Sequence, residues 1–337
     1  MLTRYIQEIF RQGTLTEEET REAILHIMHG ECSAVQIAAL LTALHSAGEN
    51  EEEITGAARA MREAGEHLTT SRQDLLDIVG TGGDGLNTFN ISTLAALAAA
   101  GAGAAVAKHG NRAMTGKCGA ADLLAQLGLN LNASSEKVAR SISECGIGFL
   151  FAQKMHPAMR YAGPVRRELG FRTIFNLLGP LTNPAAVKYH LIGVYAPQYA
   201  PVFAAVLKRL GSRRAMIVCG EDGMDEISVS AGTQVSELTE SGQILNYTVT
   251  PGQFGLPCYA ADELRGSDAV GNAEIARRLL AGEERGAKRS AVLLNAGAAL
   301  YISGLAADLR DGIQKAAASI DNGDALRKLR DMVEKCQ

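Results

Sequence analysis

The chain has 337 residues, 47% of them hydrophobic, which is enough to build two domains or one large domain around a full core. Its formal net charge of −4 argues against a basic surface for nucleic acid. The six cysteines are scattered without a C-x-x-C pair, so we expect free thiols in a reducing compartment and no zinc finger.

The first ten residues have the spacing of an amphipathic helix and lack the apolar core of a signal peptide. The longest uncharged run of small residues, 91–107, is mainly Ala and Gly, and it is shorter than the roughly 20 strongly apolar residues of a membrane span. We therefore expect a cytoplasmic protein that binds neither membrane nor nucleic acid.

Residues 1–66 are expected to be wholly helical, because apolar residues recur there at helical spacing. Three helix starts carry a hydroxyl or amide residue followed three positions later by Glu or Gln: Thr16 with Glu19, Ser33 with Gln36, and Asn50 with Glu53. No pattern in this part indicates chemistry, so packing or dimer contact is its expected role.

From residue 74 onward, strand-like runs alternate with helical ones. The strand-like runs are 75–79, 104–107, 147–151, 190–195 and 215–218, and shorter β-like pieces in 228–250 suggest an antiparallel edge. Helices are expected between the strands, for example at 134–145 and 198–210, and three more close the chain at 269–281, 286–303 and 308–334. The alternation predicts an α/β fold with a mostly parallel central sheet flanked by helices.

Residues 156–184 interrupt this alternation. The segment holds four of the eight prolines and a cluster of cations: Arg160, Arg166, Arg167 and Arg172. We interpret it as a connection that passes between two domains, a place where ligand sites are common.

A glycine-rich loop at residues 80–93 separates a strand-like run from an alanine-rich helix. Bare backbone N–H groups at a helix N-terminus bind phosphate, although a tight turn without a ligand is the alternative. Gly80, Gly82 and Gly85 also match the dinucleotide pattern G-x-G-x-x-G, but the next strand ends in basic residues, which disfavours NAD and leaves NADP open. A Walker A loop is excluded because Leu86 follows the last glycine.

A second candidate loop, residues 108–117, carries the fixed cations Lys108, Arg112 and Lys117. Both loops leave the carboxyl ends of predicted parallel strands, and in open α/β sheets these ends share one ligand crevice. Two phosphate-binding surfaces in one crevice predict a substrate with more than one phosphate group.

The adjacent acids Asp225 and Glu226 follow the strand-like run 215–218, again at a carboxyl end. Magnesium takes oxygen ligands, often one or two carboxylates together with substrate phosphates, so this pair is a candidate Mg²⁺ site. No Ser-His-Asp or Cys-His nucleophile set is evident. The chemistry is therefore expected to depend on positioning and charge stabilisation.

Five stretches together resemble the anthranilate phosphoribosyltransferases: GTGGD at 80–84, NIST at 90–93, KHGNR at 108–112, GPLTNPA at 179–185, and the acids Asp225 and Glu226. The resemblance covers nearly the whole chain, in order. It implies transfer of the phosphoribosyl group of 5-phosphoribosyl 1-pyrophosphate (PRPP) to the amine of anthranilate in tryptophan biosynthesis. It also implies a homodimer with two Mg²⁺ per subunit.

The resemblance further implies a helical domain of residues 1–70, with a returning segment near 160–185, that forms the dimer contact. Residues 71–337 would form the PRPP-binding α/β domain. The family's PRPP-binding positions correspond to Gly80, Gly83, Asp84, Thr88, Asn90, Ile91, Ser92, Thr93, Lys108, His109, Gly110, Asn111, Arg112, Thr115, Gly116 and Ala120.

Anthranilate would contact Gly80, Asn111 and Arg166, since the family's anthranilate-binding positions correspond to these residues. An arginine suits the planar carboxylate of anthranilate because it donates two parallel hydrogen bonds. Mg²⁺ would contact Ser92, Asp225 and Glu226. Lys108, Asp225 and Glu226 would be the catalytic residues, acting by charge stabilisation through Mg²⁺ and pyrophosphate.

The sequence departs from the family pattern in residues 113–120, where Cys118 and Ala120 stand in place of hydroxyl residues. This departure leaves open a related transferase with a modified aromatic amine as acceptor. Two more distant functions share the architecture, a nucleoside phosphorylase and a non-enzymatic nucleic-acid-binding relative. KHGNR argues against the first, and the net acidity with the retained acid pair argues against the second.

Overall fold

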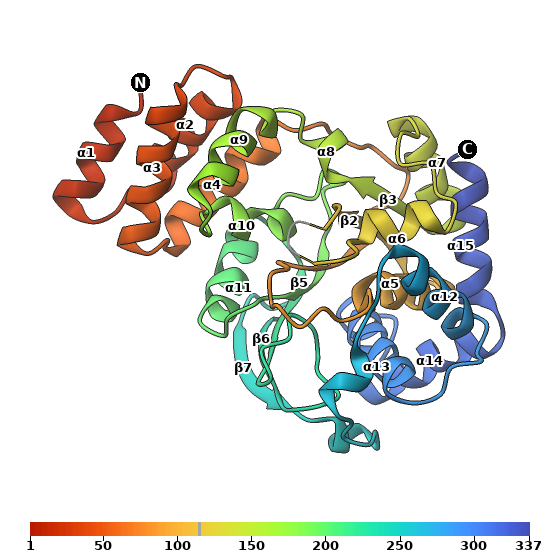
Figure 1. The fold of residues 1–337 in the computed structure, drawn as a ribbon. Coiled ribbons are helices and arrows are strands. Elements are labelled where there is room, and N and C mark those ends of the chain that lie inside the picture. Colours follow the sequence, from red (N-terminus) through yellow and green to blue (C-terminus); the bar gives the residue numbers. More distant parts are fainter. Residues whose placement is uncertain (114–115) are drawn as a thin grey trace.

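The computed structural model describes residues 1–113 and 116–337, and it consists of a helical bundle joined to a larger α/β part (Figure 1). The bundle helices are α1 (Thr3–Gln12), α2 (Glu17–Met28), α3 (Ala34–Ala47) and α4 (Glu51–Glu63). The three predicted caps are confirmed, because the side chains of Thr16, Ser33 and Asn50 accept the backbone N–H groups of Glu19, Gln36 and Glu53.

The central sheet has seven strands in the order β3-β2-β1-β4-β5-β6-β7. The strands are β1 (Leu75–Gly80), β2 (Ala105–Gly110), β3 (Ile147–Phe151), β4 (Tyr189–Gly193), β5 (Arg214–Gly220), β6 (Thr233–Leu238) and β7 (Ile244–Val249). The first five run parallel, and β6 and β7 are antiparallel, as the sequence predicted. The chain builds outward from β1 to β3 and then returns to the other side of β1, so the topological switch lies between β1 and β4.

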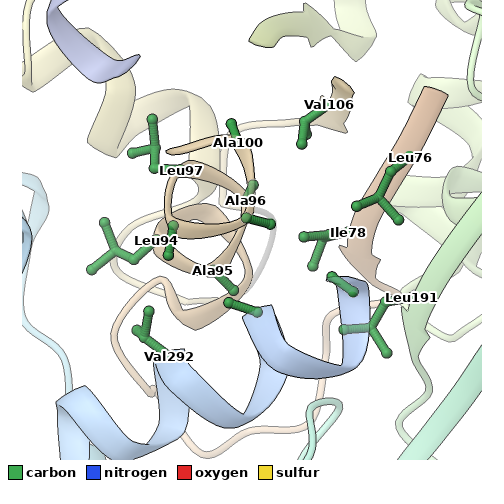
Figure 2. Close-up of a cluster of buried hydrophobic side chains, with 14 of the residues drawn as sticks. Leu76, Ile78, Leu94, Ala95, Ala96, Leu97, Ala100, Val106, Leu191 and Val292 are labelled. Atoms are coloured by element: carbon green, nitrogen blue, oxygen red, sulfur yellow. The ribbon is translucent and has the colours of Figure 1, made fainter. Parts of the chain in front are cut away.

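The two faces of the sheet belong to two hydrophobic clusters, because side chains alternate along each strand. Leu191 of β4 and Met216 of β5 pack on the side of α5 (Ile91–Gly101) and α13 (Ala287–Ile302), whereas Ile192 of β4 and Ile217 of β5 belong to the cluster of α11 (Tyr199–Arg209) and the bundle. Figure 2 shows the alanine-rich α5 beside α13, and both helices pack on this face of the sheet, α5 against β1 and β2 and α13 against β4 and β5. The small side chains of α5 permit this close packing, and the first turn of α5 lies beside Lys108 of β2 and Glu226.

The segment after β3 returns to the bundle. It contains α8 (Ala152–Met155), α9 (Met159–Leu169), α10 (Phe175–Leu178) and the 3-10 helix η1 (Gly179–Leu181). Ala162 and Val165 of α9 and Phe175 and Leu177 of α10 share a hydrophobic cluster with the bundle helices.

The remaining elements share the hydrophobic cluster of α5 and α13, on the face of the sheet opposite the bundle. They are α6 (Ala120–Gln126), α7 (Ser135–Cys145), η2 (Pro251–Phe254), η3 (Ala261–Leu264), α12 (Ala269–Leu280), α14 (Leu309–Asp321) and α15 (Asp324–Lys335). The prediction of one helix over 308–334 was wrong. Gly323 has a φ of +83°, a left-handed conformation that ends α14 and starts α15. No helix in the described ranges is both long and apolar enough to cross a membrane.

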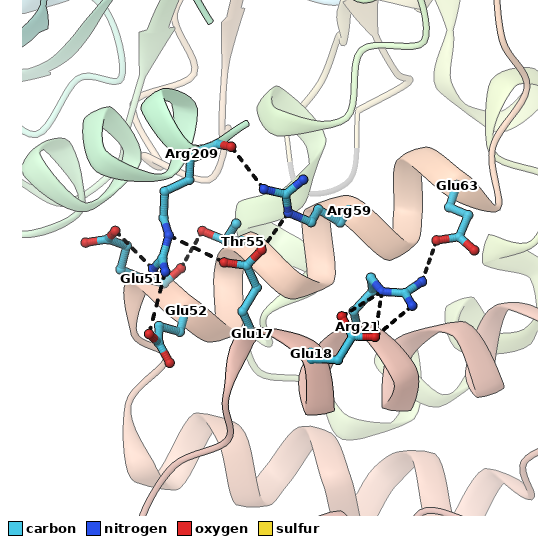
Figure 3. A network of polar contacts seen from close by, with 9 residues as sticks. All are labelled: Glu17, Glu18, Arg21, Glu51, Glu52, Thr55, Arg59, Glu63 and Arg209. Atoms are coloured by element: carbon cyan, nitrogen blue, oxygen red, sulfur yellow. Dashed lines mark hydrogen bonds and ion pairs between the residues drawn. The ribbon is translucent and has the colours of Figure 1, made fainter. Parts of the chain in front are cut away.

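A network of ion pairs joins α11 to the bundle (Figure 3). The guanidinium of Arg209 lies 3.4 Å from Glu17, 3.3 Å from Glu51 and 3.6 Å from Glu52. The backbone carbonyl of Arg209 also accepts a hydrogen bond from Arg59 at 3.0 Å. The end of α11 is thereby tied to both α2 and α4.

Replacing Arg209 with Ala is expected to lower the free energy of unfolding by about 1 kcal/mol, because the network is exposed and such pairs are screened by water. The loss should shrink in 1 M NaCl, which screens exposed charges. Urea denaturation at low and high salt measures both effects. An equal loss at both salt concentrations would contradict an electrostatic origin.

Candidate active site

The glycine-rich loop leaves β1 at Gly80 and enters α5 at Ile91. Gly82, Gly83 and Gly85 have φ values of +69°, +81° and +77°, which side-chain-bearing residues rarely adopt. The loop therefore requires glycine at these positions for its backbone conformation, in addition to any need to expose N–H groups.

The acid pair packs directly on this loop. Asp225 Oδ2 accepts the N–H of Gly82 at 2.7 Å, and Glu226 Oε1 accepts the N–H of Ser92 at 3.0 Å in the first turn of α5. A Cβ on Gly80 would lie 2.3 Å from Asp225 Oδ2. Burial raises the pKa of both acids, and the negative charge of the nearby Asp84 raises both pKa values further.

Lys108 lies in β2 rather than in a loop, so the expected strand end at Ala107 was wrong. The side chain is 3% exposed, and its Nζ donates to the carbonyl of Ile78 at 2.6 Å and to Ser92 Oγ at 3.3 Å. Burial lowers the pKa of Lys108, an effect opposed by the surrounding carboxylates. The ammonium group is thus held beneath the glycine-rich loop, beside the acids.

His109 and Gly110 also belong to β2. The His109 ring is 3% exposed, its Nδ1 lies 3.1 Å from the carbonyl of Gly179, and its centroid is 5.2 Å from that of His156. Burial lowers the pKa of His109 to about 3, so the ring is neutral. Its position supports a packing role next to the connecting segment.

The loop after β2 is organised by Asp122 in the first turn of α6. Its carboxylate accepts hydrogen bonds from Arg112 Nη1 at 2.7 Å and from the N–H groups of Ala113 and Gly119 at 2.9 and 3.0 Å. Arg112 is thus already paired. The prediction for Thr115 lies outside the described residues, whereas Gly116 is exposed, and Ala120 begins α6.

The other residues predicted to bind PRPP occupy the glycine-rich loop and the start of α5. Thr88 forms a β-bridge with Arg265, and Asn90 Nδ2 donates to the carbonyl of Cys118 at 3.0 Å. Ile91 and Thr93 are 1% and 2% exposed, so their side chains are buried in the fold.

The three residues predicted to bind anthranilate lie in different parts of the chain: Gly80 ends β1, Asn111 follows β2, and Arg166 belongs to α9. Arg166 lies on α9 with its guanidinium carbon 5.6 Å from the centroid of the Phe175 ring, and burial lowers its pKa. Asn111 Oδ1 accepts the N–H of Arg112 at 2.8 Å. Within the described residues, no hydrogen bond or ion pair joins Arg166 to Asn111 or Gly80.

Buried polar residues for which no role was predicted hold these loops in place. Asn183 donates to Asp77 Oδ2 and to the carbonyl of Ala107, both at 2.7 Å, and Asp77 Oδ1 accepts the N–H of His109 at 3.1 Å. Asn295 of α13 bonds both the N–H and the carbonyl of Ile227, directly after the acid pair, at 3.0 Å. Two features of the sequence indicated this arrangement: the charged residue inside the apolar strand 75–79, and the GPLTNPA stretch at 179–185, which contains Asn183.

The residues present fit a Mg²⁺ ion that shares its ligands with a substrate. Asp84 Oδ2 is buried without a hydrogen-bond partner in the described structure, next to the carboxylates of Asp225 and Glu226. These are the hard oxygen donors that Mg²⁺ takes. No group of three or more His, Cys, Asp or Glu side chains in metal-binding geometry is found among the described residues, so phosphate and water would have to complete the coordination.

The fold and site together define a glycosyl transferase with a helical bundle domain and an α/β domain. The corresponding models, a glycosyl transferase family helical bundle domain and a glycosyl transferase family a/b domain, match residues 3–65 and 72–326. Within this class, the chain is 51% identical over 333 residues to the anthranilate phosphoribosyltransferase of Myxococcus xanthus, covering 99% of this chain and 98% of that one. The chain belongs to the anthranilate phosphoribosyltransferase family, which confirms the resemblance seen in the sequence.

Solved structures of the family have the same fold. The anthranilate phosphoribosyltransferase of Thermus thermophilus superimposes with a TM-score of 0.93 at 46% identity, over 99% of this chain and 98% of that one. The Saccharomyces cerevisiae enzyme, solved in complex with PRPP and Mg, gives a TM-score of 0.92 at 30% identity, over 99% of this chain and 97% of that one. The predicted fold class, a small helical domain and a larger α/β domain, is confirmed.

Proposed function

We propose that this protein transfers the phosphoribosyl group of PRPP to the amine of anthranilate, giving N-(5-phosphoribosyl)anthranilate and pyrophosphate in tryptophan biosynthesis. The observation that carries the proposal is the convergence of Gly82, Ser92, Lys108, Asp225 and Glu226 at the carboxyl ends of the parallel strands. Membership of the family supports it, as does the yeast relative's complex with PRPP and Mg.

In this proposal, the backbone N–H groups of the glycine-rich loop and of the first turn of α5 bind the phosphates of PRPP. Two Mg²⁺ ions, held by Ser92, Asp225 and Glu226, would neutralise the charge that develops on the leaving pyrophosphate. Lys108 adds a fixed positive charge below the same loop, anchored by the carbonyl of Ile78. The attacking aromatic amine is weakly basic, so the reaction does not require a strong general base.

Loss of anthranilate fluorescence in the presence of PRPP and Mg²⁺ tests the activity directly. The protein is expected to consume anthranilate and release pyrophosphate. Binding of PRPP without consumption of anthranilate would instead point to a modified aromatic amine as acceptor. Failure to bind PRPP would contradict the proposal as a whole.

Arg166 is proposed to bind the anthranilate carboxylate, and its replacement with Ala is expected to raise the KM for anthranilate about tenfold or more. The KM for PRPP should stay within about twofold. Lys at this position should restore only part of the loss, because an ammonium group cannot donate two parallel hydrogen bonds.

Arg167, the exposed neighbour of Arg166 on α9, provides the matched control. Its replacement with Ala should leave both KM values near those of the wild type. Equal effects of the two substitutions would contradict a specific role for Arg166.

We further propose that residues 1–70, with 160–185, form a helical domain through which two copies associate, and that 71–337 form the PRPP-binding domain. Phe10 on α1 and Val35 on α3 are 77% and 78% exposed, unusually high for large apolar side chains of one small bundle. A second copy of the same bundle would cover them.

The proposed substrates are charged, water-soluble metabolites, which suits a cytoplasmic enzyme.

Replacing both Phe10 and Val35 with Asp is expected to convert a dimer into a monomer, as measured by light scattering after size-exclusion chromatography. Val270 on α12 is 62% exposed and lies in the α/β part, so its replacement with Asp should leave the dimer intact. A monomeric wild type, or a dimer that survives the double substitution, would contradict the proposed interface.

A further inference from the structure

We propose that Asn272, which lies outside the motifs assigned to PRPP, is a positioning residue. Through Asn90 it holds together the two loops proposed to bind PRPP, the glycine-rich loop and the loop before α6. The inference rests on the proposed function, because Asn90 belongs to the loop assigned there to PRPP. It adds a residue on α12, 182 positions away from Asn90 in the chain, to the machinery of that site.

The side-chain amide of Asn272 has one orientation in the structure. The residue is 2% exposed, and its Oδ1 accepts the N–H of Ser267 at 2.7 Å, just before α12 begins. Its Nδ2 therefore faces the other way and donates to Asn90 Oδ1 at 3.0 Å. Asn272 lies in the first turn of α12, and these two hydrogen bonds fix the direction of its amide.

Asn90 passes this restraint to the second loop. Its Nδ2 donates to the carbonyl of Cys118 at 3.0 Å, and the thiol of Cys118 lies 3.5 Å from Asn90 Oδ1. A continuous series of hydrogen bonds thus runs from α12, through the glycine-rich loop, to the loop that precedes α6. The Asn90 side chain is occupied by these contacts, so its main contribution is to join the glycine-rich loop to the loop before α6.

Backbone contacts show independently that the segment just before α12 supports the glycine-rich loop. The N–H of Phe89 donates to the carbonyl of Leu264 at 3.1 Å, and the N–H of Gly266 donates to the carbonyl of Asn87 at 2.9 Å. A Cβ on Gly266 would lie 2.8 Å from the backbone of Thr88 and Phe89. Residues 264–272 therefore lie against residues 87–90 and place Asn272 opposite Asn90.

Two substitutions isolate the Asn272 amide. Asn272→Asp keeps the shape and the acceptor for Ser267 but replaces the donor with an oxygen that faces Asn90 Oδ1. Asn272→Leu has a similar shape and removes both hydrogen bonds. Either change leaves the half-buried acceptor of Asn90 without this donor, so each is expected to raise the dissociation constant for PRPP about tenfold.

The experiment measures binding of PRPP with Mg²⁺ by calorimetry, turnover by anthranilate fluorescence, and thermal melting. We expect the Asn272 variants to raise the dissociation constant and KM for PRPP, with kcat at saturating PRPP within about twofold of the wild type. In an Asn90→Ala background the same substitutions should have no further effect on PRPP affinity, although they should still lower the melting temperature.

Leu280→Ala is the matched control, because Leu280 is fully buried on the same helix and its truncation destabilises the core. It should lower the melting temperature without changing PRPP affinity. Wild-type affinity in both Asn272 variants, or equal losses with and without Asn90, would overturn the inference while leaving the proposed function intact. A wild-type protein that does not bind PRPP would overturn both.

Discussion

Replacement of Asp225 and Glu226 together with Ala is expected to lower Mg²⁺-dependent turnover by at least about 10³-fold. The pair supplies the carboxylates that reach both the glycine-rich loop and the first turn of α5. Removing the ligands of a metal that stabilises a leaving group costs several kcal/mol in the transition state. Steady-state turnover measured over a range of Mg²⁺ concentrations checks this result.

Asp225→Asn with Glu226→Gln separates the need for charge from the need for oxygen atoms, and this variant should be nearly as inactive as the alanine pair. Glu221 lies in the same loop but is exposed, so Glu221→Ala should behave like the wild type. PRPP and Mg²⁺ should raise the melting temperature of the wild type and leave that of the alanine variant unchanged. Wild-type turnover in the alanine variant would rule out the assignment of the acids.

Local patterns in the sequence were sufficient to predict the framework of the molecule. The three capping pairs are contacts within four residues, and the structure contains all of them. The alternation of apolar strands and helices predicted the parallel sheet, which places two loops and one acid pair at its carboxyl ends. A resemblance that spans five motifs then identified the family.

Contacts between distant residues account for what the sequence did not show. The apolar pattern of β2 stops at Ala107, yet its backbone pairing with β3 continues to Gly110. The buried ammonium group of Lys108 is accommodated there by the carbonyl of Ile78. Asn272 and Asn295 are ordinary polar residues in the sequence, and their partners lie 182 and 68 positions away, so no local pattern indicates that they hold the site. Asn183 belongs to the GPLTNPA stretch, but its partner Ala107 lies 76 positions away, so the stretch alone does not show what it binds.

Gly193 is a further example, because it reads as part of an apolar strand although the site depends on its lack of a side chain. It ends β4 beside Gly80, on the strand adjacent to β1. A Cβ on Gly193 would lie 1.5 Å from the backbone carbonyl oxygen of Asp225, far inside any possible contact distance. Since the neighbour is backbone, the acid-bearing loop itself would have to move.

Replacement of Gly193 with Ala is therefore expected to displace Asp225 by about 1 Å or more and to reduce kcat/KM for PRPP by about 10²-fold or more, since such misplacements carry costs of this size. Gly252 in η2 has no atom within 4 Å of its ideal Cβ, so Gly252→Ala should retain wild-type turnover. Circular dichroism should show both variants folded. Wild-type kcat/KM in Gly193→Ala would mean that the loop can shift without losing the Mg²⁺ site, and the close packing of Asp225 on the strand ends would then not set the geometry of the reaction.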